Sequence, residues 1–145
     1  MKKISYNEAL SQIVREDPRY DEHAYLFIRE ALDHTIQTLD KPTEGPGRHV
    51  TGRELLEGIR EYALQEFGPM ARRVLAHWGV HTCEDFGEIV FNLVNKGILG
   101  KTENDQKDDF SGGYDFNESF VQPFLPKTPK QNQQETAPVK GKDRI

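Results

Sequence analysis

Apolar side chains recur at the three- and four-residue spacing of an amphipathic helix in five stretches, which predicts a mainly α protein. The first stretch follows Ser5 and Glu8, which have the spacing of a capping box. It should end before Asp17-Pro18, because the residue before a proline disfavours the helical conformation. The other four stretches lie at about 21–39, 51–67, 70–78 and 83–96. We therefore expect a compact domain of about five helices.

The starts of two helices are marked strongly. Thr51 and Glu54 have capping-box spacing, and Thr82 and Asp85 repeat it with the shorter acidic side chain. Gly97 follows the last apolar stretch, as is typical of a helix that ends in a left-handed residue. These residues predict where the third and fifth helices begin and where the fifth ends.

Residues 98–116 are rich in turn-forming residues and favour either a short β-hairpin or an irregular C-terminal cap. With a hairpin, the last three helices would give a winged-helix-like order. Five of the fourteen aromatic residues then lie within fifteen positions: Phe110, Tyr114, Phe116, Phe120 and Phe124. We expect this segment to dock on the helices, since rings placed so densely have much apolar area to bury.

Composition divides the chain in two. Residues 1–125 are predicted to form a single helical domain, and residues 126–145 a disordered basic tail, because the tail has no aromatic residue and few apolar ones. The tail carries five basic and two acidic residues, a balance of +3. Since the whole chain carries −5, residues 1–125 carry −8. The predicted domain is therefore distinctly acidic.

Two glycines fall inside predicted helices, where glycine costs about 1 kcal/mol relative to alanine. They are Gly58 and Gly87. A neighbouring element packed too closely for a side chain would explain why each is tolerated. Both residues therefore predict close approaches between parts of the fold.

Residues 49–93 carry several short motifs that are distinctive in combination. They are His49-Val50-Thr51-Gly52, Glu54-Leu55-Leu56, Gly58-Ile59-Arg60, Val74-Leu75, Trp78-Gly79 and Asp85-Phe86-Gly87-Glu88-Ile89-Val90-Phe91-Asn92-Leu93. With these motifs the chain resembles a family of short uncharacterised proteins of planctomycete and verrucomicrobial bacteria, a likeness that covers most of residues 4–125. The resemblance implies a single domain and implies no activity, cofactor or partner.

Charge argues against nucleic-acid binding through the fifth helix. Residues 82–118 hold nine acidic residues and three lysines, a balance of −6. This negative charge would repel a polyanion. We expect this helix, if it binds anything, to meet a protein. The polar side of its predicted helical wheel gives the candidate partner face: Glu84, Asp85, Glu88, Asn92 and Asn95.

Candidate chemistry is sparse. His77, His81 and Cys83 have a spacing that suggests zinc, but a fourth ligand is missing and a helix ends between the two histidines. Cys83 at a helix start has acidic neighbours, which oppose a reactive thiolate. Six acidic residues at 103–118 do not match a calcium loop, and a solvated acidic loop accounts for them better. We expect no catalytic residue, metal or cofactor.

An anion site is a further candidate. Arg48, His49 and Arg53 surround the start of the third helix, whose free N–H groups favour anions. An ordinary capped helix start is the simpler reading of these residues. The segment is not a phosphate-binding loop, because it lacks the following lysine and the preceding strand.

These observations favour a cytoplasmic, non-catalytic protein-interaction or regulatory module without a membrane segment. The first alternative is a nucleic-acid-binding regulator that uses an arginine-rich side: Arg48, Arg53, Arg60, Arg72 and Arg73. The second alternative is a small enzyme with a site formed by histidine and Cys83. The single cysteine excludes an internal disulfide, which suits the cytoplasm.

Overall fold

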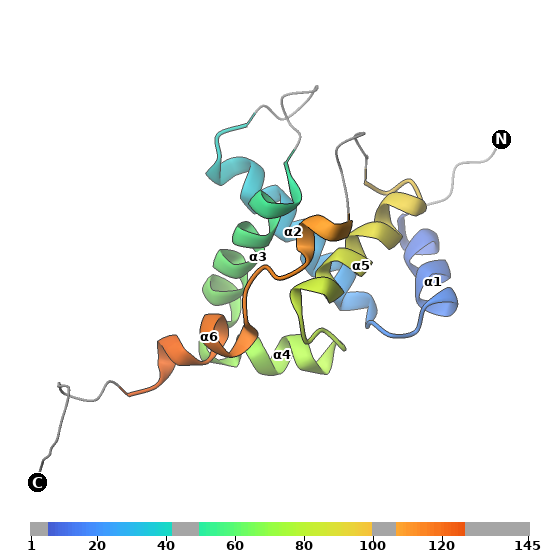
Figure 1. The fold of residues 1–145 in the computed structure, drawn as a ribbon. Coiled ribbons are helices and arrows are strands. Elements are labelled where there is room, and N and C mark those ends of the chain that lie inside the picture. Colours follow the sequence, from blue (N-terminus) through green and yellow to red (C-terminus); the bar gives the residue numbers. More distant parts are fainter. Residues whose placement is uncertain (1–5, 42–49, 100–106, 127–145) are drawn as a thin grey trace, which may run out of the picture.

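The protein is mainly helical, as predicted, in a computed structural model that describes residues 6–41, 50–99 and 107–126. Within these ranges no residue lies in a strand. The α-helices are α1 (Tyr6–Glu16), α2 (Glu22–Thr38), α3 (Gly52–Phe67), α4 (Ala71–His77), α5 (Cys83–Asn95) and α6 (Phe116–Phe120). Short 3₁₀ helices are η2 (Gly68–Met70), η3 (Lys107–Phe110) and η4 (Gln122–Phe124). The five predicted helices are confirmed as α1 to α5 (Figure 1).

Both predicted capping boxes within the described ranges are present. At α3, Thr51 Oγ1 accepts from Glu54 N at 3.1 Å, and Glu54 Oε1 accepts from Thr51 N at 3.0 Å. At α5, Thr82 Oγ1 and the Asp85 carboxylate make the same reciprocal pair. Each box satisfies donors that the first helical turn leaves without partners, so the local sequence defines these starts.

The end of α5 also follows from its sequence. Gly97 has φ +77°, which glycine adopts without the cost of a Cβ. The Gly97 N–H donates to Val94 O at 3.0 Å, and Ile98 N–H donates to Leu93 O at 2.9 Å. This is the hydrogen-bond pattern of a glycine-terminated helix.

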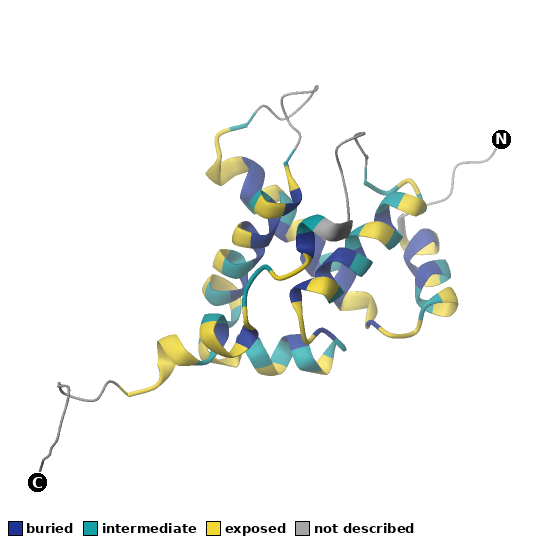
Figure 2. Ribbon diagram, viewed as in Figure 1, coloured by how far each residue is buried: buried dark blue, intermediate teal, exposed yellow. Residues whose placement is uncertain are grey.

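The core forms around α2, which packs against α3 along much of its length and also contacts α1 and α5. In Figure 1, α2 and α3 lie side by side and α4 lies at their lower end. The buried positions face the centre of the helix assembly, and the outward positions are exposed or intermediate (Figure 2). Fully buried large side chains come from several helices: Leu10, Tyr25, Ile28, Ile59, Leu75, Phe86, Ile89 and Leu93.

Gly58 and Gly87 lie at close approaches, as predicted. A Cβ on Gly58 of α3 would overlap Thr35 Oγ1 of α2 and lie 2.8 Å from Thr35 Cβ. A Cβ on Gly87 of α5 would lie 3.0 Å from Phe110 Cβ and 3.2 Å from Phe110 Cγ. Glycine is therefore required at position 58 for α2 and α3 to meet, whereas a Cβ at position 87 would require Phe110 to shift by a few tenths of an ångström.

The described part of residues 98–116 forms an irregular cap and no hairpin strand, while residues 100–106 lie outside the described ranges. Phe110 ends η3 and is 4% exposed, because Gly52 and Gly87 leave room for it between α3 and α5. A ring inserted between two helices anchors this segment, so pairing of strands is not needed to hold it. No wing of a winged helix is formed by the described residues.

Four of the five C-terminal aromatic residues dock, and one does not. Phe110, Phe116 and Phe120 are buried, and Tyr114 donates its hydroxyl to Leu56 O at 2.9 Å. Phe116 and Phe120 pack edge to face at 5.1 Å. The expectation that Phe124 docks is wrong, since this residue is 44% exposed beyond α6.

The predicted tail, except for Pro126, lies outside the described residues. Its disorder and its independence from the domain stay predictions. Ser5 of the first capping box lies outside them as well. No helix in the described ranges combines the length and apolar character needed to cross a bilayer.

Candidate functional site

The five side chains of the predicted partner face do not form one free surface. Asp85 accepts from the Tyr20 hydroxyl at 2.6 Å and from the backbone N–H of His81 at 2.9 Å. Asn92 donates to the Tyr25 hydroxyl at 3.0 Å. Asp85 therefore holds α5 against the connection between α1 and α2, and Asn92 holds it against α2.

The other three members differ in their surroundings. Glu88 lies 3.4 Å from the guanidinium of Arg19 in an ion pair. Glu84 is exposed and accepts from the backbone N–H of Gly112 at 3.1 Å. Asn95 is exposed near the end of α5. The helical wheel identified the polar side of α5 correctly, but it could not reveal that the preceding connection covers part of that side.

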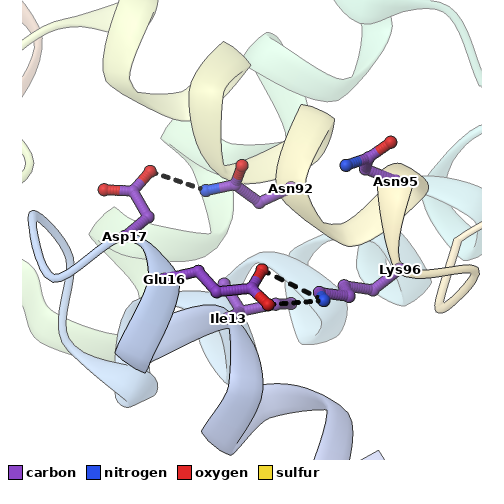
Figure 3. Close-up of a pocket in the computed structure, with 6 residues that line it drawn as sticks. All are labelled: Ile13, Glu16, Asp17, Asn92, Asn95 and Lys96. Atoms are coloured by element: carbon purple, nitrogen blue, oxygen red, sulfur yellow. Dashed lines mark hydrogen bonds and ion pairs between the residues drawn. The ribbon is translucent and has the colours of Figure 1, made fainter.

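A small polar cleft lies where α5 meets the end of α1 (Figure 3). It is lined by Ile13, Glu16, Asp17, Asn92, Asn95 and Lys96. Lys96 Nζ lies 3.0 Å from Glu16 Oε1, and Asn92 Nδ2 donates to Asp17 Oδ2 at 3.0 Å. Since most of its charged and amide groups are engaged with one another, the cleft is a polar contact between two helices.

Asp17 is the centre of this contact. Its carboxylate accepts two hydrogen bonds from the Arg19 guanidinium, at 2.8 and 2.7 Å, and a third from Asn92. The Arg19 hydrogen bonds hold the pKa of Asp17 well below its usual range, more strongly than partial burial raises it, and Asn92 adds to the depression. The charged form of Asp17 is therefore favoured in the folded state.

Acidification should remove this contribution to stability. Because the pKa is lower in the folded state, the stabilisation is present above about pH 4, the unfolded pKa, and is lost as pH falls towards the folded pKa. We expect Asp17→Asn to reduce the free energy of unfolding by about 1–2 kcal/mol at neutral pH. As the pH falls below about 4, the variant should lose less stability than the parent. Urea unfolding across this range measures both effects.

The neighbouring variant Glu16→Gln is the control. Glu16 is 64% exposed in its pair with Lys96, so solvent screens the pair and its loss should change stability by less than about 0.5 kcal/mol. Parallel acid profiles for Asp17→Asn and the parent would show that Asp17 does not link folding to pH.

Cys83 occupies a structural position. It is 1% exposed, and its Sγ accepts from Tyr114 N at 3.4 Å. Burial raises the pKa of the Cys83 thiol, and the charge of Glu84 adds to that effect. A neutral, enclosed thiol is a poor nucleophile.

The two histidines of the candidate metal site, His77 and His81, are exposed. No group of three or more potential metal ligands is assembled within the described ranges. The arrangement therefore lends no geometric support to a site formed by histidine and Cys83.

The candidate anion site cannot be assembled from the described residues, since Arg48 and His49 lie outside them. Arg53 is exposed, and its guanidinium donates to Ser111 O at 3.3 Å. This contact connects the start of α3 to the C-terminal cap. Arg53 thus has a structural role whether or not an anion binds.

The remaining arginines of the arginine-rich side have varied roles. Arg60 is paired with Glu57 on the same helix, which offsets its charge. Arg72 places its guanidinium 5.5 Å from the centre of the Phe116 ring, and its Nη1 is buried without a hydrogen-bond partner among the described residues. Arg73 is exposed. Only part of this set is available to a phosphate backbone.

A feature that the sequence did not reveal runs along the junction of α2, α3 and α4. Aromatic rings there contact one another in an unbroken row, which we name the aromatic seam. Its members are His23, Phe27, His34, Tyr62, Phe67 and Trp78. The row joins residues that the helical pattern assigned separately to three helices.

The ring geometry shows how the seam is built. Phe27 is buried at its centre, 5.5 Å from Tyr62 and 5.6 Å from both Phe67 and Trp78, measured between ring centres. His23 stacks on Trp78 at 6.4 Å with an angle of 14° between their planes. His34 lies 5.3 Å from Tyr62 at the other end. The buried ring therefore supports a row of outer rings.

The outer rings are accessible to solvent. Tyr62, Phe67 and Trp78 are partly exposed, and 71% of the His23 side chain is exposed. Positions 23, 27 and 34 have the spacing of one helical stripe, which was the only trace of the seam in the sequence. Its ring partners on α3 and just after α4 could not be identified without the tertiary structure.

Carboxylates border the seam. Tyr62 donates its hydroxyl to Glu30 at 3.2 Å, and His34 Nε2 lies 3.6 Å from Glu61. Burial, followed by the negative charges of Glu30 and Glu66, raises the pKa of Tyr62. The phenol therefore lies in a region of negative potential.

Comparison with protein-family models, curated proteins and solved structures found no match to this chain. The resemblance of residues 49–93 to uncharacterised planctomycete and verrucomicrobial proteins therefore stays a prediction.

Proposed function

We propose that the protein is a non-catalytic interaction module that binds a partner protein through the aromatic seam. The observation that carries the proposal is the row of partly exposed rings supported from below by the buried Phe27. Aromatic residues are enriched at protein interfaces and dominate their binding energy. A rigid ring also loses little conformational freedom when a partner covers it.

Rigidity distinguishes the seam from scattered surface rings. Each outer ring contacts another ring, so the row is held in one arrangement before binding. Such preorganisation lowers the entropic cost of association. The proposal includes a cytoplasmic location, which a chain with one buried cysteine suits because no disulfide is required.

Site-specific photo-crosslinking tests this function. A photoreactive phenylalanine analogue replaces the exposed seam residue His23 and the exposed Glu66, which precedes the seam residue Phe67, and also two exposed residues elsewhere, Ser11 and Asn95. In extracts, we expect the two seam positions to crosslink the same partner and the two remote positions to crosslink it weakly or not at all. Excess unlabelled protein should compete, because the partner site is saturable.

Two outcomes would contradict the proposal. A partner crosslinked mainly from Asn95 would place the interface on α5. Crosslinks that unlabelled protein cannot compete away, from all four positions equally, would indicate non-specific contact.

A further inference from the structure

We infer that the aromatic seam binds a cationic segment of its partner, one in which lysine or arginine residues alternate with apolar residues. This inference rests on the proposed function and adds the chemistry of the partner. It follows from the combination of accessible rings with carboxylates at the same junction. Neither feature by itself would define the ligand.

Several carboxylates lie at the aromatic seam. The carboxylates of Glu30 and Glu61 contact ring side chains of the seam, and Asp21 lies 2.7 Å from the His23 ring. Glu30 and Glu61 are exposed, on α2 and α3 respectively. Acidic groups therefore reach the seam from both helices and extend to the end formed by His23.

The charge of a partner segment determines how well it can cover these carboxylates. An acidic or wholly apolar segment laid on the rings would remove water from these carboxylates without supplying counter-charges, which is costly. A cationic segment supplies them, because its ammonium or guanidinium groups can form charge-assisted hydrogen bonds with the carboxylates while its apolar residues cover the rings. The same contacts would then serve affinity and selectivity.

The net charge of the domain also acts at longer range. Residues 1–125 carry −8, so a basic partner is attracted before contact and a polyanion is repelled. Electrostatic complementarity of this kind acts chiefly on the association rate. The partner is therefore a basic protein segment and not a nucleic acid.

The chain provides its own reporter. Trp78 is the only tryptophan in the sequence and lies in the seam between His23 and Phe67. Its fluorescence in the full-length chain thus reports directly on occupancy. The probe is a synthetic amphipathic peptide of leucine and lysine without tryptophan, and its comparator has glutamate at every lysine.

We expect the lysine peptide to shift Trp78 emission with a Kd at least about tenfold lower than that of the glutamate peptide, and to weaken with added salt. The double variant Glu30→Lys and Glu66→Lys should raise that Kd by about tenfold or more. The control pair, Glu16→Lys and Glu84→Lys, changes net charge equally on α1 and α5, outside the seam. It should raise the Kd by less than about threefold, because screening limits the reach of exposed charges.

The possible outcomes distinguish a failure of the cationic-segment inference from a failure of the proposed interaction function. Equal weakening by both double variants, or equal binding of both peptides, would overturn the cationic segment and leave crosslinking through the seam intact. Failure of the seam crosslinks themselves would overturn the interaction module as well. If glutamine at the five basic tail positions alone shifts resting Trp78 emission, the chain's own tail occupies the seam and the partner assignment is overturned.

Discussion

Truncation after Asp109 should unfold the domain, whereas truncation after Pro126 should leave its midpoint of thermal unfolding nearly unchanged. The shorter chain loses Phe110, Phe116 and Phe120, each at most 4% exposed. Burial of one such side chain contributes about 2–3 kcal/mol, so the three together approach the whole stability of a typical domain. Circular dichroism melts of both truncated chains measure the difference.

A single substitution in the full-length chain tests the same packing in case the truncated protein cannot be produced. Phe120 is fully buried and packs edge to face on Phe116 and Tyr114. Phe120→Ala should cost about 3–5 kcal/mol, while Phe124→Ala should cost less than about 1 kcal/mol because Phe124 is 44% exposed. A cooperative melt of the 1–109 chain at the parental midpoint would show that the cap contributes little to the fold.

Gly58→Ala should destabilise the protein by about 2 kcal/mol, although alanine is the better helix former by about 1 kcal/mol. The new methyl group would overlap Thr35 Oγ1. Thr35 is only 2% exposed, and its hydroxyl donates to Ala31 O at 2.7 Å. Overlap within a buried contact forces α2 and α3 apart. Urea unfolding of the parent and the variant measures the cost.

Substitutions of Thr35 identify the cause. In the Gly58→Ala background, Thr35→Ala removes the overlapping hydroxyl and should recover part of the loss, but Thr35→Ser retains it and should recover little. Gly87→Ala should cost less than Gly58→Ala, because the methyl group meets the side chain of Phe110 at 3.0–3.4 Å and that ring can shift. If Gly58→Ala melts above the parent, the steric account of this helix contact is wrong.

Local sequence determined the helices because their signals lie within a few residues of each other. The boxes at Thr51 and Thr82 and the stop at Gly97 were all read from spacing and are all formed. The close contacts at Gly58 and Gly87 were also predictable, since glycine inside a helix needs a reason beyond local propensity. What the two glycines contact was not predictable.

The partner face on α5 shows the limit of a single-helix argument. A helical wheel separates polar from apolar positions, and it placed Asp85 and Asn92 on the polar side. Their actual partners, Tyr20 and Asp17, lie more than sixty residues away in the sequence. Only the packing of α5 beside the α1–α2 connection decided that these polar groups are structural.

The sequence by itself determined that the chain is mainly helical, where α3 and α5 begin, where α5 ends, and that residues 1–125 are acidic. These properties depend on neighbours along the chain or on simple addition of charge. The tertiary structure decided that Phe110 ends a docked 3₁₀ helix and that Phe124 remains exposed. It also decided that rings from α2, from α3 and from Trp78, just after α4, meet in one seam. Contacts between distant residues depend on how whole helices pack, and hydrophobic spacing within one helix does not encode its partner.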